Sequence, residues 1–156
     1  MTRRTTFFNG ESVDSTTPKT DQHTSAKGAR ILFVTTVPIT LTSFLIPFAK
    51  HLKAQGALVD CASMGASTYG GLETFNNRFD ISWDRSLSSM LRYSACRKQL
   101  ETILDEGKYD IVHVHTPIAA FMTRKACAQW KARHSSKKPA VIYTVHGFHF
   151  FEGQTS

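Results

Sequence analysis

Two apolar, strand-like segments end in histidine, and imidazole groups at such positions could bind a ligand or transfer a proton. Residues 111–115 contain His113 and His115 at their end, and residues 140–145 are followed by His146 and a glycine. Ligands of open parallel sheets bind just outside the carboxyl ends of the strands. The same ending on two strands therefore predicts one cleft that the histidines of both strands line.

These histidines raise the question of a metal site, because neutral imidazole is a good zinc ligand. His113 and His115 are two positions apart in a predicted strand and so point to one face. Asp110 and Glu152 are the nearby carboxylates, and neither H-E-x-x-H nor C-x-x-C spacing occurs. One histidine could instead be buried and hydrogen-bonded to the backbone. We predict no metal ligand and no cofactor, and a histidine-metal hydrolase is the least favoured alternative.

A helix start is expected directly after His115. Thr116 is a typical N-cap residue, and Pro117 suits the first helical position because its missing N–H has no partner there. The free N–H groups of that first turn could bind a phosphate or a sugar hydroxyl next to His146. A capping motif without any ligand is the alternative.

The segment between the first strand and the first helix, residues 37–42, occupies the turn that contacts phosphate in doubly wound folds. It contains no glycine and does not match G-x-G-x-x-G, which disfavours a dinucleotide-binding dehydrogenase. Thr40 and Thr42 offer hydroxyl groups there, although an ordinary capped helix start explains them at least as well. Arg85, at the start of the next predicted helix, is a second candidate anion contact or a simple surface charge.

Strands alternate with helices along the chain, which implies a mostly parallel sheet with right-handed crossovers and helices on both faces. We predict a Rossmann-like α/β domain over residues 29–156. Residues 1–28 are polar, lack periodicity and are predicted to be a disordered tail. The predicted strands are 31–35, 57–62, 79–83, 111–115 and 140–145, and the predicted helices are 43–54, 86–106 and 117–133.

The first of these helices is expected to follow a loop over residues 37–42, with Ser43 as its N-cap. Four of its apolar residues fall on one helical stripe: Phe44, Leu45, Phe48 and Leu52.

The formal charge of +7 over 156 residues indicates a basic domain that attracts anions, such as phosphorylated ligands or an anionic membrane surface. A solvated basic surface without a partner is the alternative. No RNA-binding aromatic motif, zinc finger or helix-turn-helix spacing occurs, so nucleic acid is not expected as a partner. The three cysteines are far apart and are interpreted as reduced thiols. No apolar segment approaches the roughly 20 residues of a transmembrane helix, and no signal peptide is recognised.

Four segments together resemble the N-terminal domain of family 4 glycosyltransferases, of the bacterial capsular or exopolysaccharide type. They are residues 31–35, 44–52, 109–117 and 141–151, and the resemblance covers about residues 29–153. It implies the N-terminal half of a GT-B fold, in which two Rossmann-like domains face a cleft. It also implies retaining transfer from a nucleotide sugar, without a required metal, to a lipid-linked or saccharide acceptor. The expected location is cytoplasmic, possibly peripheral at the inner membrane face.

The resemblance also implies roles for individual residues. His146 takes the place of the histidine that contacts the donor sugar and is the predicted catalytic residue. Residues 38–42 match the loop near the reacting groups, and the end of the fourth strand borders the cleft. The predicted substrate-binding residues are Pro38, Thr40, Thr42, Arg85, His115, Thr116, Gly147 and His149.

Two features depart from the family pattern. The glycines that many members carry after the first strand are missing, which weakens any phosphate contact there. The paired glutamates that hold the nucleotide sugar belong to a C-terminal domain that has no counterpart in this sequence. We therefore expect the chain to be inactive alone, and a non-catalytic acceptor-binding module that needs a separate partner domain is the alternative.

Overall fold

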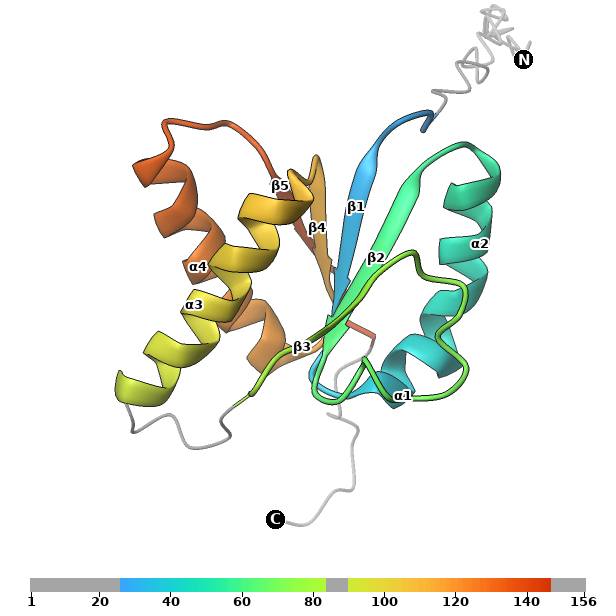
Figure 1. Cartoon of the computed structure of the whole chain (residues 1–156), viewed down its shortest axis with the longest axis horizontal. Helices are drawn as coiled ribbons and strands as arrows, with labels where there is room; N and C mark the ends of the chain where they lie inside the picture. Colours follow the sequence, from blue (N-terminus) through green and yellow to red (C-terminus); the bar gives the residue numbers. More distant parts are fainter. Residues whose placement is uncertain (1–25, 84–89, 147–156) are drawn as a thin grey trace, which may run out of the picture.

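The computed structural model describes residues 26–83 and 90–146 (Figure 1). Residues 1–25, which make up most of the predicted tail, lie outside the described part. So do three predicted site residues, Arg85, Gly147 and His149.

Five parallel strands form one sheet in the order β3-β2-β1-β4-β5. This topology confirms the prediction of a Rossmann-like α/β fold. β3 ends at Asp80, before the predicted end at residue 83, although the backbone N–H of Ile81 still donates to the carbonyl of Ser63 at 3.1 Å. The strands are β1 (Arg30–Val34), β2 (Leu58–Ser63), β3 (Arg78–Asp80), β4 (Ile111–Val114) and β5 (Ala140–Tyr143).

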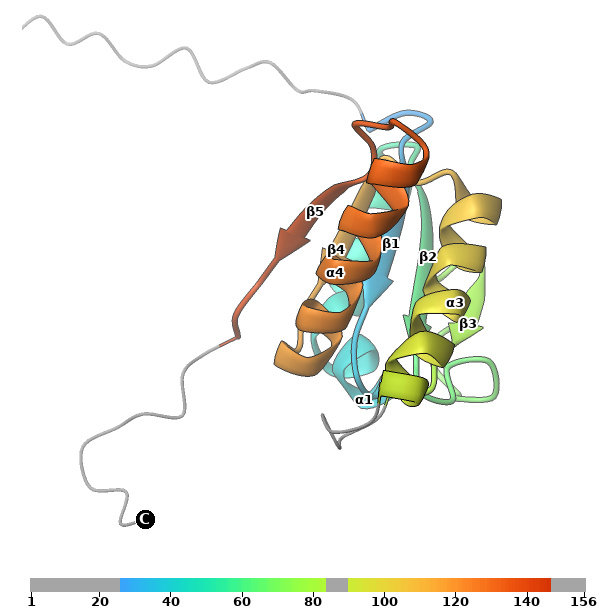
Figure 2. The ribbon, with the colours of Figure 1, turned by 90° about the vertical axis from the view of Figure 1, so that its left-hand side faces the viewer.

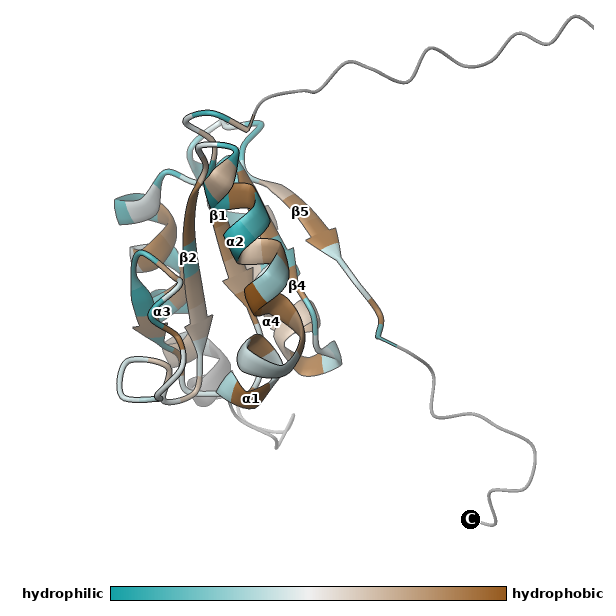
Figure 3. Ribbon diagram, turned by 90° about the vertical axis from the view of Figure 1, so that its right-hand side faces the viewer, coloured by the Kyte–Doolittle hydropathy of each residue, from teal (hydrophilic) through white to brown (hydrophobic). Residues whose placement is uncertain are grey.

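Helices cover both faces of the sheet (Figures 1 and 2). α3 (Met90–Gly107) and α4 (Pro117–Arg133) lie on one face, where Leu32 and Val34 of β1 point into the core. α2 (Ile46–Ala54) lies on the other face, as Figure 3 shows, and it packs over Ile31 and Phe33 of the same strand. A strand buried on both faces must be apolar throughout, which explains the continuous apolar segment.

The prediction of a loop over residues 37–42 with Ser43 as N-cap is wrong. Helical backbone begins at Pro38 and passes through α1 (Pro38–Thr40) and the π-helical turn η1 (Leu41–Leu45) directly into α2. Pro47 explains the wider turn: inside a helix its ring collides with the carbonyl four residues earlier, and it has no N–H to donate. A π-turn just before the proline relieves this conflict.

This wider turn also decides which side chains of the first helix reach the core. Leu45 is buried, whereas Phe44 and Phe48 of the predicted stripe are 55% and 62% exposed. Leu41 and Ala49 are buried instead, one turn before and one turn after Leu45. Two phenylalanine rings of this helical segment are therefore accessible at the surface.

A buried carboxylate joins three parts of the fold. Asp60 of β2 is 2% exposed and accepts a hydrogen bond of 2.7 Å from the hydroxyl of Tyr109, just before β4. It also accepts from the backbone N–H of Asn77 at 2.9 Å and from its side-chain amide at 3.1 Å. Burial, and next the hydrogen bond to Asp60, raise the pKa of Tyr109. The hydroxyl therefore stays protonated and acts as a donor.

Across residues 26–83 and 90–146, no helix combines the length and the apolar character needed to cross a membrane.

Candidate functional site

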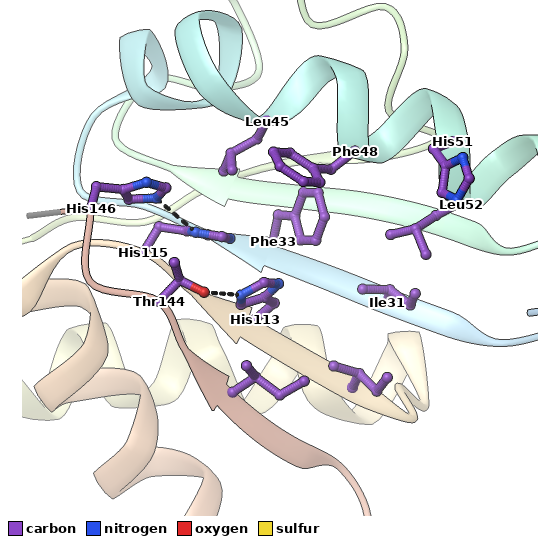
Figure 4. A pocket seen from close by; sticks show the side chains of 12 residues that line it. Ile31, Phe33, Leu45, Phe48, His51, Leu52, His113, His115, Thr144 and His146 are labelled. Carbon is purple, nitrogen blue, oxygen red and sulfur yellow. Dashed lines mark hydrogen bonds between the residues drawn. The ribbon is translucent and has the colours of Figure 1, made fainter. Parts of the chain in front are cut away.

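The carboxyl ends of β1, β4 and β5 meet at one edge of the sheet, and two predicted site residues come together there. His115 follows β4 and is 5% exposed, whereas His146 lies three residues after β5 and is exposed. Nδ1 of His115 lies 3.1 Å from Nε2 of His146, and the two rings are stacked with their centres 5.2 Å apart (Figure 4).

A third histidine extends this pair along the sheet. His113 and His115 share one face of β4, as their spacing predicts, and their ring centres are 4.0 Å apart. Nε2 of His113 lies 2.7 Å from the hydroxyl of Thr144. Phe33 of β1 meets both rings edge-on at 5.5 Å. The three imidazoles thus form a row from the sheet interior to its carboxyl edge.

Phe44 is a neighbour of the site that sequence reasoning missed. Its ring stacks on His146 with the centres 5.6 Å apart and an angle of 26° between the planes. The sequence placed Phe44 on a helical stripe with Leu45, whereas in the structure Leu45 is buried and Phe44 is exposed. An exposed aromatic ring thus restricts how the imidazole of His146 can lie.

Thr116 stands at the N-cap of α4, as predicted, but its hydroxyl does not cap the helix. It instead accepts a hydrogen bond of 2.9 Å from the backbone N–H of Thr36, and the two hydroxyl oxygens are 2.5 Å apart. Thr36 was also missed from the sequence. Its position directly after the first strand was the available signal, because residues at the carboxyl ends of strands meet at one edge.

The predicted residues of the first helical segment are close to this edge in the fold. Pro38 is the first residue of α1, which lies at the carboxyl ends of the strands (Figure 1). Thr42 donates its hydroxyl to the carbonyl of Ile39 at 3.1 Å, so its proton is occupied within the helix. Within the described residues, no hydrogen bond joins Thr40 or Thr42 to the histidine row.

A hollow of about 370 Å³ lies between α2 and the sheet, beside the histidine row (Figure 4). Apolar side chains form most of its wall, and four imidazoles and one hydroxyl provide the polar groups. Apolar hollows with a few convergent polar groups are typical of ligand sites. The apolar side chains belong to Ile31, Phe33, Leu45, Phe48, Leu52, Ile111 and Ile142.

Burial decides the charge state of the inner histidines. It lowers the pKa of His115 to about 3, with smaller contributions from His113 and His146. Burial, followed by the nearby His146, also lowers the pKa of His113. Both side chains are therefore neutral at pH 7 and can donate or accept a hydrogen bond without carrying charge.

The described part of the chain contains no group of three or more histidine, cysteine or carboxylate side chains arranged to hold a metal ion. In the histidine row, Nε2 of His113 and Nδ1 of His115 already face hydrogen-bond partners.

Comparisons with known proteins identify the sequence family. Residues 30–156 match the family described as glycosyl transferase 4-like. A relative from Bacillus subtilis (strain 168), named "Putative glycosyltransferase EpsD", is 36% identical over 124 residues, which cover 80% of this chain. The matched segment spans only 30% of the length of that relative.

Solved structures are similar to this chain at low sequence identity. The C-terminal domain of a hydrogenase from Pyrococcus furiosus has a TM-score of 0.50 at 11% identity, over 77% of this chain and 92% of that domain. A UDP-N-acetylglucosamine 2-epimerase has a TM-score of 0.46 at 17% identity, over 76% of this chain and 32% of its own. The hydrogenase domain shows a shared α/β fold and carries no information about activity.

Proposed function

Because the chain belongs to the glycosyl transferase 4-like family, we propose that it forms the acceptor-side, N-terminal domain of a retaining glycosyltransferase that uses a nucleotide sugar. The observation that carries this proposal is the contact between His115 and His146 at the carboxyl edge of the sheet. In an open parallel sheet this edge is where ligands bind. The exposed imidazole of His146 would contact the donor sugar as the catalytic residue.

The chemistry of glycosyl transfer agrees with these side chains. Positive charge develops on the sugar and negative charge on the departing diphosphate, as the oxocarbenium-like transition state of glycosidic cleavage requires. His146 can donate a hydrogen bond to a sugar oxygen, and a preorganised donor of this kind stabilises the transition state. Phe44 would hold the imidazole in place from one side.

The first turn of α4 supports a phosphate contact at the same edge. The hydroxyl of Thr116 is turned toward Thr36, so no side-chain cap occupies the first N–H groups of the helix. The N-terminus of a 17-residue helix carries a partial positive charge that favours anions. Thr116 and residues 38–42 would line this part of the cleft.

The proposed substrates are a nucleotide-sugar donor and a lipid-linked or saccharide acceptor, in the synthesis of a bacterial surface polysaccharide. Residues outside this chain would hold the nucleotide, and we propose that the chain alone has no turnover. A cytoplasmic location at the inner membrane face fits the basic surface of α4, where Arg124, Lys125 and Lys131 line one hollow together with the exposed Phe121. Anionic lipid headgroups attract such a surface.

A non-catalytic acceptor-binding module is the second candidate. The observation that favours it is that apolar side chains form most of the wall of the hollow beside the histidine row, which suits an acceptor with an apolar part. In that case a separate protein would supply the donor site, and this chain would hold the acceptor at the same edge of the sheet.

An NMR titration of the 15N-labelled chain tests the proposed function. The ligands are UDP, several nucleoside diphosphate sugars and the corresponding sugar phosphates. We expect the sugar-containing ligands to shift the amides of Thr36, Thr116 and His146, and UDP alone to shift them much less. Equal shifts with UDP would place the nucleotide site on this chain. If no ligand shifts these amides, the sugar site lies elsewhere.

A further inference from the structure

The two ring nitrogens of His115 have very different surroundings. Nδ1 lies 3.1 Å from Nε2 of His146. Nε2 is buried, and within residues 26–83 and 90–146 it has no hydrogen-bond partner. The nearest side chains offer none, because Phe33 meets the ring edge-on and Nε2 of His113 already faces Thr144. Within the part of the chain that the structure describes, Nδ1 is therefore the only nitrogen of His115 that makes a hydrogen bond.

A hydrogen bond between two neutral imidazoles requires one N–H and one lone pair, so only two proton arrangements are possible. In the first, Nδ1–H of His115 donates to Nε2 of His146, and a lone pair remains unpaired in the core. In the second, Nε2–H of His146 donates to Nδ1 of His115, and the buried Nε2 of His115 must then carry an unpaired N–H.

Of these two arrangements, the second leaves an orphan N–H in the core, which is rarely found in folded proteins. Burial deprives an unpaired donor and an unpaired acceptor of water alike, but an N–H group without an acceptor is the rarer of the two in protein interiors. A protonated His146 would lead to the same result, because its Nε2–H would also face Nδ1 of His115. The first arrangement is therefore favoured.

We propose that His115 is a positioning residue that holds His146 as the neutral tautomer with its proton on Nδ1. Nε2 of His146 is then occupied as an acceptor, and Nδ1–H is the only donor that its exposed ring presents. The stacked ring of Phe44 on one side limits reorientation of this imidazole.

This assignment deepens the function proposed above and rests on it for the identity of the ligand. An Nδ1–H donor recognises an oxygen acceptor, such as a sugar hydroxyl or ring oxygen. It cannot take a proton from a substrate through Nδ1, which is already protonated. His146 would thus act as a hydrogen-bond donor to the sugar. The hydrogen bond from His115 to Nε2 of His146 would keep the donated proton on Nδ1.

Long-range 15N–1H NMR spectra of the histidine-labelled 156-residue chain at pH 7, without ligand, test this assignment. Protonated and unprotonated ring nitrogens resonate at well-separated 15N frequencies. We expect a protonated Nδ1 and an unprotonated Nε2 in both His115 and His146. A protonated Nε2 in His146 would overturn the proposal, and this spectrum of the unsubstituted chain decides the tautomer without any variant.

Two substitutions then test whether His115 is the cause. Asparagine can place an amide N–H where Nδ1–H lies, so His115→Asn should preserve the tautomer of His146. Leucine has no donor, so in His115→Leu the imidazole of His146 should exchange between its two tautomers. The 15N shifts of its two ring nitrogens should then move toward each other. His51 lies on the wall of the same hollow, and His51→Asn is the matched control. It should leave the 15N shifts of both ring nitrogens of His146 unchanged. An unchanged His146 in a folded His115→Leu chain would contradict the positioning role.

The tautomer assignment and the proposed function can be contradicted independently of each other. The inverted tautomer in a chain whose carboxyl edge still binds sugar would remove only the positioning role. The expected tautomer in a chain that binds no sugar would instead remove the ligand and leave the proton arrangement in place.

Discussion

The hydroxyl oxygens of Thr36 and Thr116 lie 2.5 Å apart, although 80 positions separate the two residues in the sequence. The backbone N–H of Thr36 also donates to the hydroxyl of Thr116 at 2.9 Å. This pair ties the segment after β1 to the start of α4 at the proposed sugar site. It explains why a typical N-cap residue leaves the first turn of its own helix without a side-chain cap.

Substitution of Thr116 by valine should destabilise this junction. Valine has the shape of threonine but no oxygen, so the N–H of Thr36 would lose its acceptor in a half-buried position. We expect the free energy of unfolding to fall by about 1–2 kcal/mol in urea denaturation. Thr116→Ser retains the hydroxyl, so its free energy of unfolding should fall less. An equal fall in the two variants would show that these hydrogen bonds do not contribute to stability.

The stability of the chain should depend on pH through His115. The pKa of His115 is lowered from 6.5 to about 3, chiefly by burial. Between pH 6.5 and about pH 3 the unfolded chain is therefore protonated at His115 and the folded chain is not. The free energy of unfolding must then fall as the pH drops from about 6.5 toward 3, by up to about 1.4 kcal/mol per pH unit. His113 contributes in the same direction.

Urea denaturation between pH 7 and pH 4 measures this dependence. His115→Asn removes the titrating group, so its free energy of unfolding should fall less steeply with acid, whatever its absolute stability. The carboxylates with lowered pKa, such as Asp80 and Asp110, are the same in both proteins. Identical slopes would mean that His115 titrates alike in the folded and unfolded chains.

The hydrogen bond between Tyr109 and Asp60 should contribute to stability. Tyr109→Phe removes one of the donors to a buried carboxylate, and we expect a loss of about 1–3 kcal/mol in the free energy of unfolding. Tyr143→Phe is the control, because Tyr143 is exposed on β5 and a surface change of this kind costs less than about 0.5 kcal/mol. Thermal or urea denaturation compares the two, and equal losses would count against the network.

Gly107, the last residue of α3, should not tolerate a side chain. A Cβ atom there would lie 1.9 Å from Cε2 of the buried Tyr109 ring, which would have to move. Alanine is otherwise the better helix former by about 1 kcal/mol, so a net loss must come from this collision. We expect Gly107→Ala to cost about 1–3 kcal/mol.

Gly70→Ala is the matched control for that substitution, because a Cβ atom at Gly70 would meet nothing within 4 Å. It should leave the denaturation midpoint nearly unchanged. If Gly107→Ala proved as stable as Gly70→Ala, the packing of Tyr109 against the end of α3 would be incorrectly described.

The sheet and the two strand-end histidines could be predicted from the sequence, because local patterns encode them. Apolar segments of strand length alternate with helical patterns, and the positions of His115 and His146 relative to the strand ends follow directly. Their contact required only the general rule that the carboxyl ends of parallel strands meet at one edge. The Thr116-Pro117 helix start is equally local.

The surroundings of the site depend on packing and could not be predicted in the same way. The π-turn of η1 accommodates Pro47 while Leu41 and Leu45 remain buried. No local sequence pattern predicts this turn. The exposed position of Phe44 beside His146 follows from that turn. Thr36 depends on a partner 80 positions away, which sequence spacing alone does not reveal.

The central claim is that His146 contributes to sugar transfer, and a chimera tests it most directly. Residues 30–156 would replace the matching segment of the Bacillus relative, and transfer of labelled sugar from a nucleotide sugar to membrane lipid would be measured. We expect His146→Ala to lower the rate roughly tenfold or more, as loss of one preorganised donor does. The far-UV spectrum should be preserved, and His134→Ala at the distant end of α4 should leave the rate unchanged. An unaltered rate in a folded His146→Ala chimera would remove His146 from the active site and contradict this account.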